Sequence, residues 1–83
     1  MALRWQKKRV SLDITDEARQ EPTVIEHDGW KVLRVGYAQL EDYQVCRSVM
    51  HTLADLLRSS APDHPDWDQR VHELNDLVLA RSA

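Results

Sequence analysis

The dipeptide Asp28-Gly29 constrains the fold of this chain more than any other short stretch. It separates two runs that are rich in β-forming residues, 23–27 and 30–37. A two-residue hairpin loop with a type I′ turn needs positive φ at both central residues, and Asp-Gly adopts this conformation readily. We therefore predict a β-hairpin that turns at Asp28-Gly29.

The two-residue loop also predicts the hairpin register, in which residues 23–27 oppose residues 34–30 in antiparallel order. Because side chains alternate between the two faces of a strand, this register sorts them into two sets. One set contains Val24, Glu26, Lys31, Leu33, Val35 and Tyr37, and the other contains Thr23, Ile25, His27, Trp30, Val32 and Arg34. Both sets include apolar side chains, so the hairpin needs cover on two sides.

A further strand is predicted from Val10 to Thr15, because Val10, Leu12 and Ile14 alternate strictly with polar residues. The preceding residues show no clear period. They predict a basic flexible arm, residues 1–8, before a single domain that spans residues 9–83. The simplest arrangement of the three strands is an antiparallel meander.

Two helices are predicted after the strands. From about Ala38 to Ser59 the apolar residues recur at helical spacing, and a narrower stripe runs through a second helix from about Pro65 to Arg81. We therefore expect an α+β fold of the βββαα type. It has two layers, a three-stranded antiparallel meander and an αα-hairpin packed on one sheet face.

A single helical layer would leave the other sheet face uncovered, and uncovered apolar surface usually marks an interface. We therefore predict a small non-enzymatic regulator, adaptor or inhibitor, homodimeric, that docks a protein partner. The expected contacts lie on this face and on the basic arm, at Trp5, Arg9, Ile25, Trp30, Val32 and Arg34. If Trp30 instead caps the helical layer by packing against it inside the core, the uncovered apolar surface of the sheet is smaller.

A nucleic-acid-binding regulator is the alternative, using the sheet and the basic residues Arg4, Lys7, Lys8 and Arg9. These cations, with Trp5 among them, suit contacts to phosphates and stacking on bases. The chain as a whole favours a protein partner, since its net charge is −3 and its pI is near 5.7. Nucleic-acid-binding domains are usually basic overall.

Catalytic chemistry has little support in the sequence. His51 and Asp55 are spaced as a helical His–Asp pair, but no nucleophile is predicted beside them, and Cys46 falls on the apolar side of its helix. With only two glycines the chain has no phosphate-binding loop. We predict no enzymatic activity, no cofactor and no small-molecule substrate.

Metal binding is likewise not predicted. His64, Asp66, Asp68 and His72 do not match a zinc-ligand spacing, and an acidic helix N-terminus accounts for these residues. The single cysteine excludes an intrachain disulfide.

Neither a membrane-spanning segment nor a signal peptide is predicted from the sequence. No apolar run approaches the roughly 20 residues needed to cross a bilayer. The basic first residues lead into no apolar segment of the signal-peptide type. We expect a cytoplasmic protein with no membrane contact.

Overall fold

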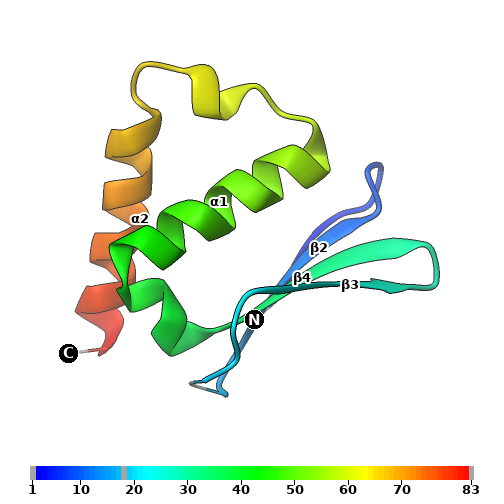
Figure 1. The fold of residues 1–83 in the computed structure, drawn as a ribbon, viewed down its shortest axis with the longest axis horizontal. Helices are drawn as coiled ribbons and strands as arrows, with labels where there is room; N and C mark the ends of the chain where they lie inside the picture. Colours follow the sequence, from blue (N-terminus) through cyan, green and yellow to red (C-terminus); the bar gives the residue numbers. More distant parts are fainter. Residues whose placement is uncertain (1, 18, 83) are drawn as a thin grey trace. The chain divides into compact units, whose positions relative to one another are not determined.

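The computed structural model describes residues 2–17 and 19–82 (Figure 1). The fold is α+β, with one four-stranded mixed sheet and two α-helices. The chain divides into two compact units, Met1–Gln39 and Leu40–Ala83. The first contains the sheet and the second contains the two α-helices, and each is described by itself.

The sheet unit has four strands in the spatial order β1-β2-β4-β3. Figure 1 shows β4 between β2 and β3. Strand β1 runs antiparallel to β2, β2 runs parallel to β4, and β4 runs antiparallel to β3. The strands are Ala2–Trp5 (β1), Val10–Thr15 (β2), Thr23–His27 (β3) and Trp30–Gly36 (β4).

The predicted hairpin is confirmed, and its register is the one that the two-residue loop predicts. All five pairs are found, from Thr23 opposite Arg34 to His27 opposite Trp30. Asp28 and Gly29 have φ angles of 51° and 80°, as a type I′ turn requires. The local sequence is therefore sufficient to predict this element.

The predicted three-stranded antiparallel meander is wrong, because β2 pairs with β4 instead of β3, and the pairing is parallel. The burial pattern agrees with this order. All five residues of β3 are exposed, whereas β4 buries Leu33, Val35 and Gly36. A strand with apolar residues on both faces is best placed in the centre of a sheet. The backbone N–H of Gly36 donates to the carbonyl of Gln20 (2.8 Å), which holds the connector between β2 and β3.

The first residues form strand β1, where the sequence predicted only a flexible arm. Leu3 pairs with Leu12 and Trp5 pairs with Val10. The turn from β1 to β2, residues 6–9, contains no Gly, Asn or Pro to signal it. Instead Arg9 takes the positive φ of 52°, which is uncommon for a residue with a side chain. The strand was missed because neither periodicity nor turn chemistry indicates it.

The second unit contains helix α1 (Tyr43–Leu57) and helix α2 (Trp67–Ser82). A short 3-10 helix, η1 (Tyr37–Glu41), lies at the junction of the units, and another, η2 (Ala61–Asp63), lies between the two α-helices. Helix α1 begins later than predicted because η1 takes up the first residues of the apolar pattern. Its N-cap is Asp42, whose carboxylate accepts from the N–H groups of Gln44 (2.9 Å) and Val45 (3.4 Å).

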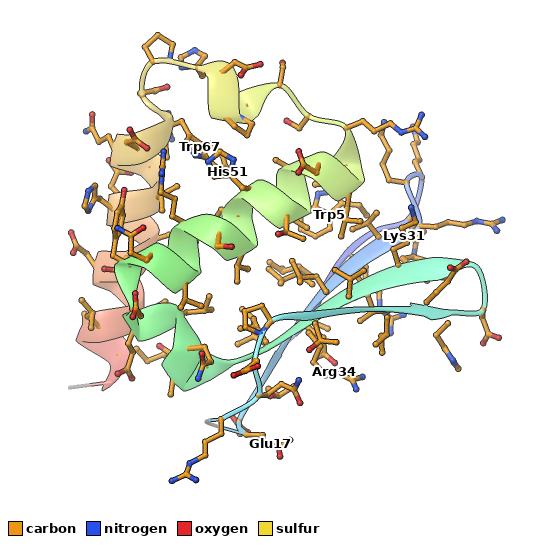
Figure 2. The ribbon with its side chains drawn as sticks, viewed as in Figure 1. Trp5, Glu17, Lys31, Arg34, His51 and Trp67 are labelled. Atoms are coloured by element: carbon orange, nitrogen blue, oxygen red, sulfur yellow. The ribbon has the colours of Figure 1, made fainter. Side chains whose placement is uncertain are left out.

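Contacts between α1 and α2 run in opposite order along the two helices, so the helices are antiparallel. The rings of Tyr43 and His72 stack at 4.0 Å, and Arg47 bonds to Asp68 at 3.2 Å. Further along α1, His51 lies against Trp67, as Figure 2 shows. The predicted pairing of two helices is thus found. Their predicted packing on one sheet face stays a prediction.

Candidate interaction face of the sheet

One face of the sheet is buried and the other is partly exposed. The buried face carries Val10, Leu12, Leu33 and Val35, each no more than 3% exposed. We call the opposite side the open face. It carries Ala2, Arg4, Ser11, Asp13, Thr23, Ile25, His27, Trp30, Val32 and Arg34, as the strand register requires.

The register arranges the open face in rows that cross all four strands. One row runs Arg4, Ser11, Val32, Ile25, and the next runs Ala2, Asp13, Arg34, Thr23. A hollow of about 670 Å³ lies over these rows. Its lining residues are Ala2, Arg4, Ser11, Asp13, Ile25, His27, Asp28, Trp30, Val32 and Arg34. The hollow is therefore built on the sheet unit alone.

Arg34 and Asp13 form an ion pair across β2 and β4. The Nε of Arg34 donates to the Oδ2 of Asp13 at 3.3 Å, and the side chains are 43% and 32% exposed. An ion pair with this exposure stabilises the fold by at most about 1 kcal/mol. Both groups stay accessible to a partner that binds in the hollow.

Arg4 and Trp30 make the second polar contact of the open face. The guanidinium carbon of Arg4 lies 6.0 Å from the ring centroid of Trp30, at the outer limit of a cation–π contact. Trp30 is half-buried and Arg4 is exposed. Among the described residues, no carboxylate lies within ion-pair distance of Arg4. Arg4 is therefore a cation whose charge is available to a ligand of the hollow.

At the β3–β4 turn, the rim of the hollow carries a further polar contact, between a histidine and a carboxylate. The Nε2 of His27 lies 3.3 Å from the Oδ2 of Asp28, and both side chains are largely exposed. The lining therefore combines two arginines, two aspartates and a histidine around an apolar centre of Ile25, Val32 and Trp30.

Four of the six residues predicted to bind a partner come together here, namely Ile25, Trp30, Val32 and Arg34. Trp5 does not join them. It pairs with Val10 and shares that residue's face, and Figure 2 shows Trp5 and Arg34 on opposite sides of the sheet. Arg9 lies in the β1–β2 turn, where its carbonyl accepts from the N–H of Lys31 at 2.9 Å.

Sequence reasoning missed Arg4 and Asp13 as members of this face. Asp13 was predicted on the polar side of its strand, but nothing in the sequence placed that side next to Arg34. Arg4 and Trp5 are adjacent, so a strand can turn only one of them toward the open face. The pairing of Leu3 with Leu12 decides that this residue is Arg4.

The basic residues of the nucleic-acid alternative lie on two elements, strand β1 and the β1–β2 turn. Lys7, Lys8 and Arg9 are exposed in the turn between β1 and β2, at one end of the sheet. Arg4 instead lines the hollow, which Asp13 and Asp28 also line. The cations are therefore divided between a turn and a face that also carries carboxylates.

Several polar residues of the helical unit contact one another. His64 bonds to Asp66, which also pairs with Arg70 (3.6 Å), and the Nε1 of Trp67 donates to the Nε2 of His51 (3.2 Å). Burial acts to raise the pKa of Asp66, but the hydrogen bond and charge of His64, with Arg70, bring it below its ordinary value. Within the described part of the chain, no group of three or more His, Cys, Asp or Glu residues is arranged to hold a metal ion.

Cys46 is a fully buried free thiol on α1. Burial raises the pKa of this thiol above its ordinary value, because the thiolate is poorly solvated inside the protein. A buried thiol of raised pKa is a poor nucleophile, which fits the apolar position predicted for it.

Over the described residues, no helix combines the length and apolar character that crossing a bilayer requires. Comparison of the chain with protein-family models, with curated proteins and with solved structures finds no match.

Proposed function

We propose that this chain is a small non-enzymatic interaction module that docks a protein partner on the open face of its sheet. The observation that carries the proposal is the hollow of about 670 Å³, whose centre is apolar and whose border holds charges of both signs. Tryptophan and arginine are the residues most often found at the energetic centre of protein interfaces, and Trp30, Arg4 and Arg34 line this hollow.

The lining suggests the chemistry of the partner. An apolar side chain of the partner would enter the hollow over Ile25 and Val32 and lie against the ring of Trp30. A partner carboxylate beside it would pair with Arg4, whose charge no described carboxylate balances. The Arg34–Asp13 pair offers both a donor and an acceptor at the opposite side of the hollow.

The same lining disfavours a nucleic acid on this face. Binding to a phosphate backbone depends on cations that neutralise several phosphates. Here Arg34 is already paired with Asp13, and Asp28 adds a second negative charge at the rim. A phosphate chain across the hollow would therefore meet carboxylates as well as arginines.

The free thiol of Cys46 bears on the cellular compartment in which the protein acts. An unpaired cysteine suits the reducing cytoplasm, where disulfides seldom form. We therefore propose that the module acts in the cytoplasm.

The proposal is tested by selecting short peptides from a random displayed library against the purified chain. Backbone amide NMR signals then locate each selected peptide. Binding is expected to shift the signals of Ile25, Val32 and Arg34, and the peptides are expected to share an apolar residue next to an acidic one. Peptides that shift only signals of α1 and α2 would contradict the proposal.

Two pairs of variants sharpen the test. Trp30→Ala is expected to weaken peptide binding about 30-fold, or ~2 kcal/mol, because the ring forms one wall of the hollow. Trp5→Ala removes the same side chain from the other face and should leave the affinity unchanged. Likewise Arg4→Glu should weaken binding to acidic peptides, whereas Lys8→Glu, an equal charge change in the β1–β2 turn, should not.

A further inference from the structure

Strand β3 forms one edge of the sheet and has the properties of a docking edge. It is the outermost strand of the order β1-β2-β4-β3, and all five of its residues are exposed. Two of its side chains are large and apolar, Val24 at 46% exposure and Ile25 at 36%. No other strand of the sheet exposes two large apolar side chains among the described residues.

The backbone groups of β3 that face away from the sheet can be identified from β4. The N–H of Lys31 donates to the carbonyl of Arg9, so the backbone groups of Lys31 point toward β2. Those of Trp30 and Val32 therefore point toward β3, where their partners are His27 and Ile25. It follows that the N–H and C=O groups of Val24 and Glu26 point outward from the edge.

The edge lacks most of the devices that proteins use to prevent strand addition, and Glu26 is its one carboxylate. Natural edge strands carry lysines, prolines or bulges that block pairing with another strand. Residues 23–27 contain no lysine and no proline, and their register with β4 is unbroken. The backbone groups of Val24 and Glu26 are therefore free to pair with an added strand.

We infer that β3 pairs antiparallel with β3 of a second copy, with Ile25 on the two-fold axis, to make one continuous eight-stranded sheet from two four-stranded sheets. The order of strands is then β1-β2-β4-β3 in one protomer, followed by the reverse order in its partner. This inference goes beyond the proposed docking function and does not depend on it.

The sequence of β3 matches itself in this register and in no neighbouring one. With Ile25 on the axis, Val24 faces the partner's Glu26, and both pairs of outward groups form hydrogen bonds. With Val24 on the axis, Glu26 would face Pro22, which has no N–H. With Glu26 on the axis, two like charges would face each other, which destabilises a strand pair.

Pairing in this register has a consequence for the open face. A two-fold axis through an antiparallel strand pair is perpendicular to the sheet, so the open faces of both protomers lie on the same side. The two Ile25 side chains meet there, at the shared edge of two hollows. The dimer would therefore present two equal docking sites side by side on one surface.

Disulfide trapping tests the register directly, in chains that carry Cys46→Ala. Residues opposite each other at a non-hydrogen-bonded position have Cα atoms about 4.5 Å apart, which is within the range of a disulfide. Ile25→Cys is therefore expected to give a covalent dimer on mild oxidation. Thr23→Cys alone and His27→Cys alone should not form a covalent dimer. Each residue would lie about 13 Å from the same residue of the partner, four residue steps along the strand.

Mixing provides a matched control. Thr23 faces the partner's His27 in the proposed register, so an equimolar mixture of Thr23→Cys and His27→Cys chains should form the mixed covalent dimer. A dimer from Thr23→Cys alone, or none from Ile25→Cys, would overturn the inference.

Proline scanning tests the edge independently of cysteine chemistry. Glu26→Pro removes an outward N–H without removing a bond to β4, and prolines are tolerated on edge strands. Light scattering should find Glu26→Pro monomeric and Glu26→Ala dimeric, with unchanged NMR signals for β4 in both. A dimer that persists in Glu26→Pro, or an unmodified chain that is monomeric at millimolar concentration, would contradict the inference. Neither variant alters Trp30 or Arg4, so failure here is distinguishable from failure of peptide docking.

Discussion

Asn75 joins two elements of the helical unit through a single side chain. It is 5% exposed, and its Nδ2 donates to the carbonyls of Leu40 (2.9 Å) and Glu41 (3.0 Å). These carbonyls lie at the end of η1, where a helix leaves acceptors without backbone partners. The side chain of Asn75 therefore satisfies groups that would otherwise be buried without a hydrogen bond.

Asn75→Leu is expected to destabilise the chain by about 2–4 kcal/mol, since it leaves two carbonyl groups without a donor. Urea unfolding measures the change in free energy. Asp76→Ala, at the next and exposed position of α2, serves as the control and should change it by less than about 0.5 kcal/mol. Equal effects of the two substitutions would show that the hydrogen bonds of Asn75 contribute little.

For single residues, the sequence alone predicts whether a side chain lies on a polar or an apolar face better than it predicts which residues the side chain contacts. The alternation of β2 places Asp13 on a polar face, and the hairpin places Arg34 beside Val32 and Trp30 on one face. The Arg34–Asp13 pair follows only when β2 lies beside β4. Asn75 is similar, because its polar amide is visible in the sequence but its two carbonyl acceptors, 34 and 35 residues away, are not.

Among the elements, the β3–β4 hairpin depends most on local sequence. Its turn requires positive φ at Asp28 and Gly29, and Gly29 adopts φ of 80°. A Cβ at Gly29 would lie 3.4 Å from a guanidinium nitrogen of Arg9, which is an ordinary contact with the end of a flexible side chain. Any penalty for a side chain at this position therefore comes from the backbone.

Gly29→Ala is expected to destabilise the chain by about 1–2 kcal/mol, the usual difference for a residue with a Cβ in the left-handed region. The measurement is the free energy of unfolding in urea, for this variant and for the same change in an Arg9→Ala chain. If the backbone conformation at Gly29 causes the penalty, Gly29→Ala should lower the free energy of unfolding by the same amount with Arg9 and with Arg9→Ala. If the loss of stability disappears in the Arg9→Ala chain, crowding against the Arg9 side chain is its cause.

Elements that depend on another element were predicted less well. Strand β1 has four residues and a turn without glycine or proline, so it exists through its pairing with β2 and not through its own propensity. The position of β4 between β2 and β3 depends on burial along the whole strand. A pattern read one segment at a time cannot compare the burial of two strands.

For the whole molecule, the distribution of charge argues against nucleic acid as the main partner. The cations of the β1–β2 turn are Lys7, Lys8 and Arg9, and the chain as a whole carries a net charge of −3. Three cations can neutralise about three phosphates. The binding constant for DNA would then fall with the logarithm of salt concentration with a slope no steeper than about −2.7.

We therefore expect weak retention of a random DNA duplex at low salt, and none at physiological salt. Fluorescence anisotropy at several salt concentrations measures the slope, and a single-stranded oligonucleotide provides the second probe. The triple variant Lys7/Lys8/Arg9→Ala should remove the residual binding. A steeper slope, with tight binding at physiological salt, would favour the nucleic-acid alternative over protein docking.

The sequence by itself determined the hairpin, its register, the alternating faces of β2 and the existence of two helices. These features follow from interactions between residues close along the chain, such as the φ preferences of a turn and the period of apolar residues. Only the tertiary structure decided that β4 is central, that β1 completes the sheet, and that Arg4 and Asp13 lie beside Trp30 and Arg34 in one hollow. Those outcomes depend on which strands bury most apolar surface when they pair, and that comparison exists only once distant segments meet.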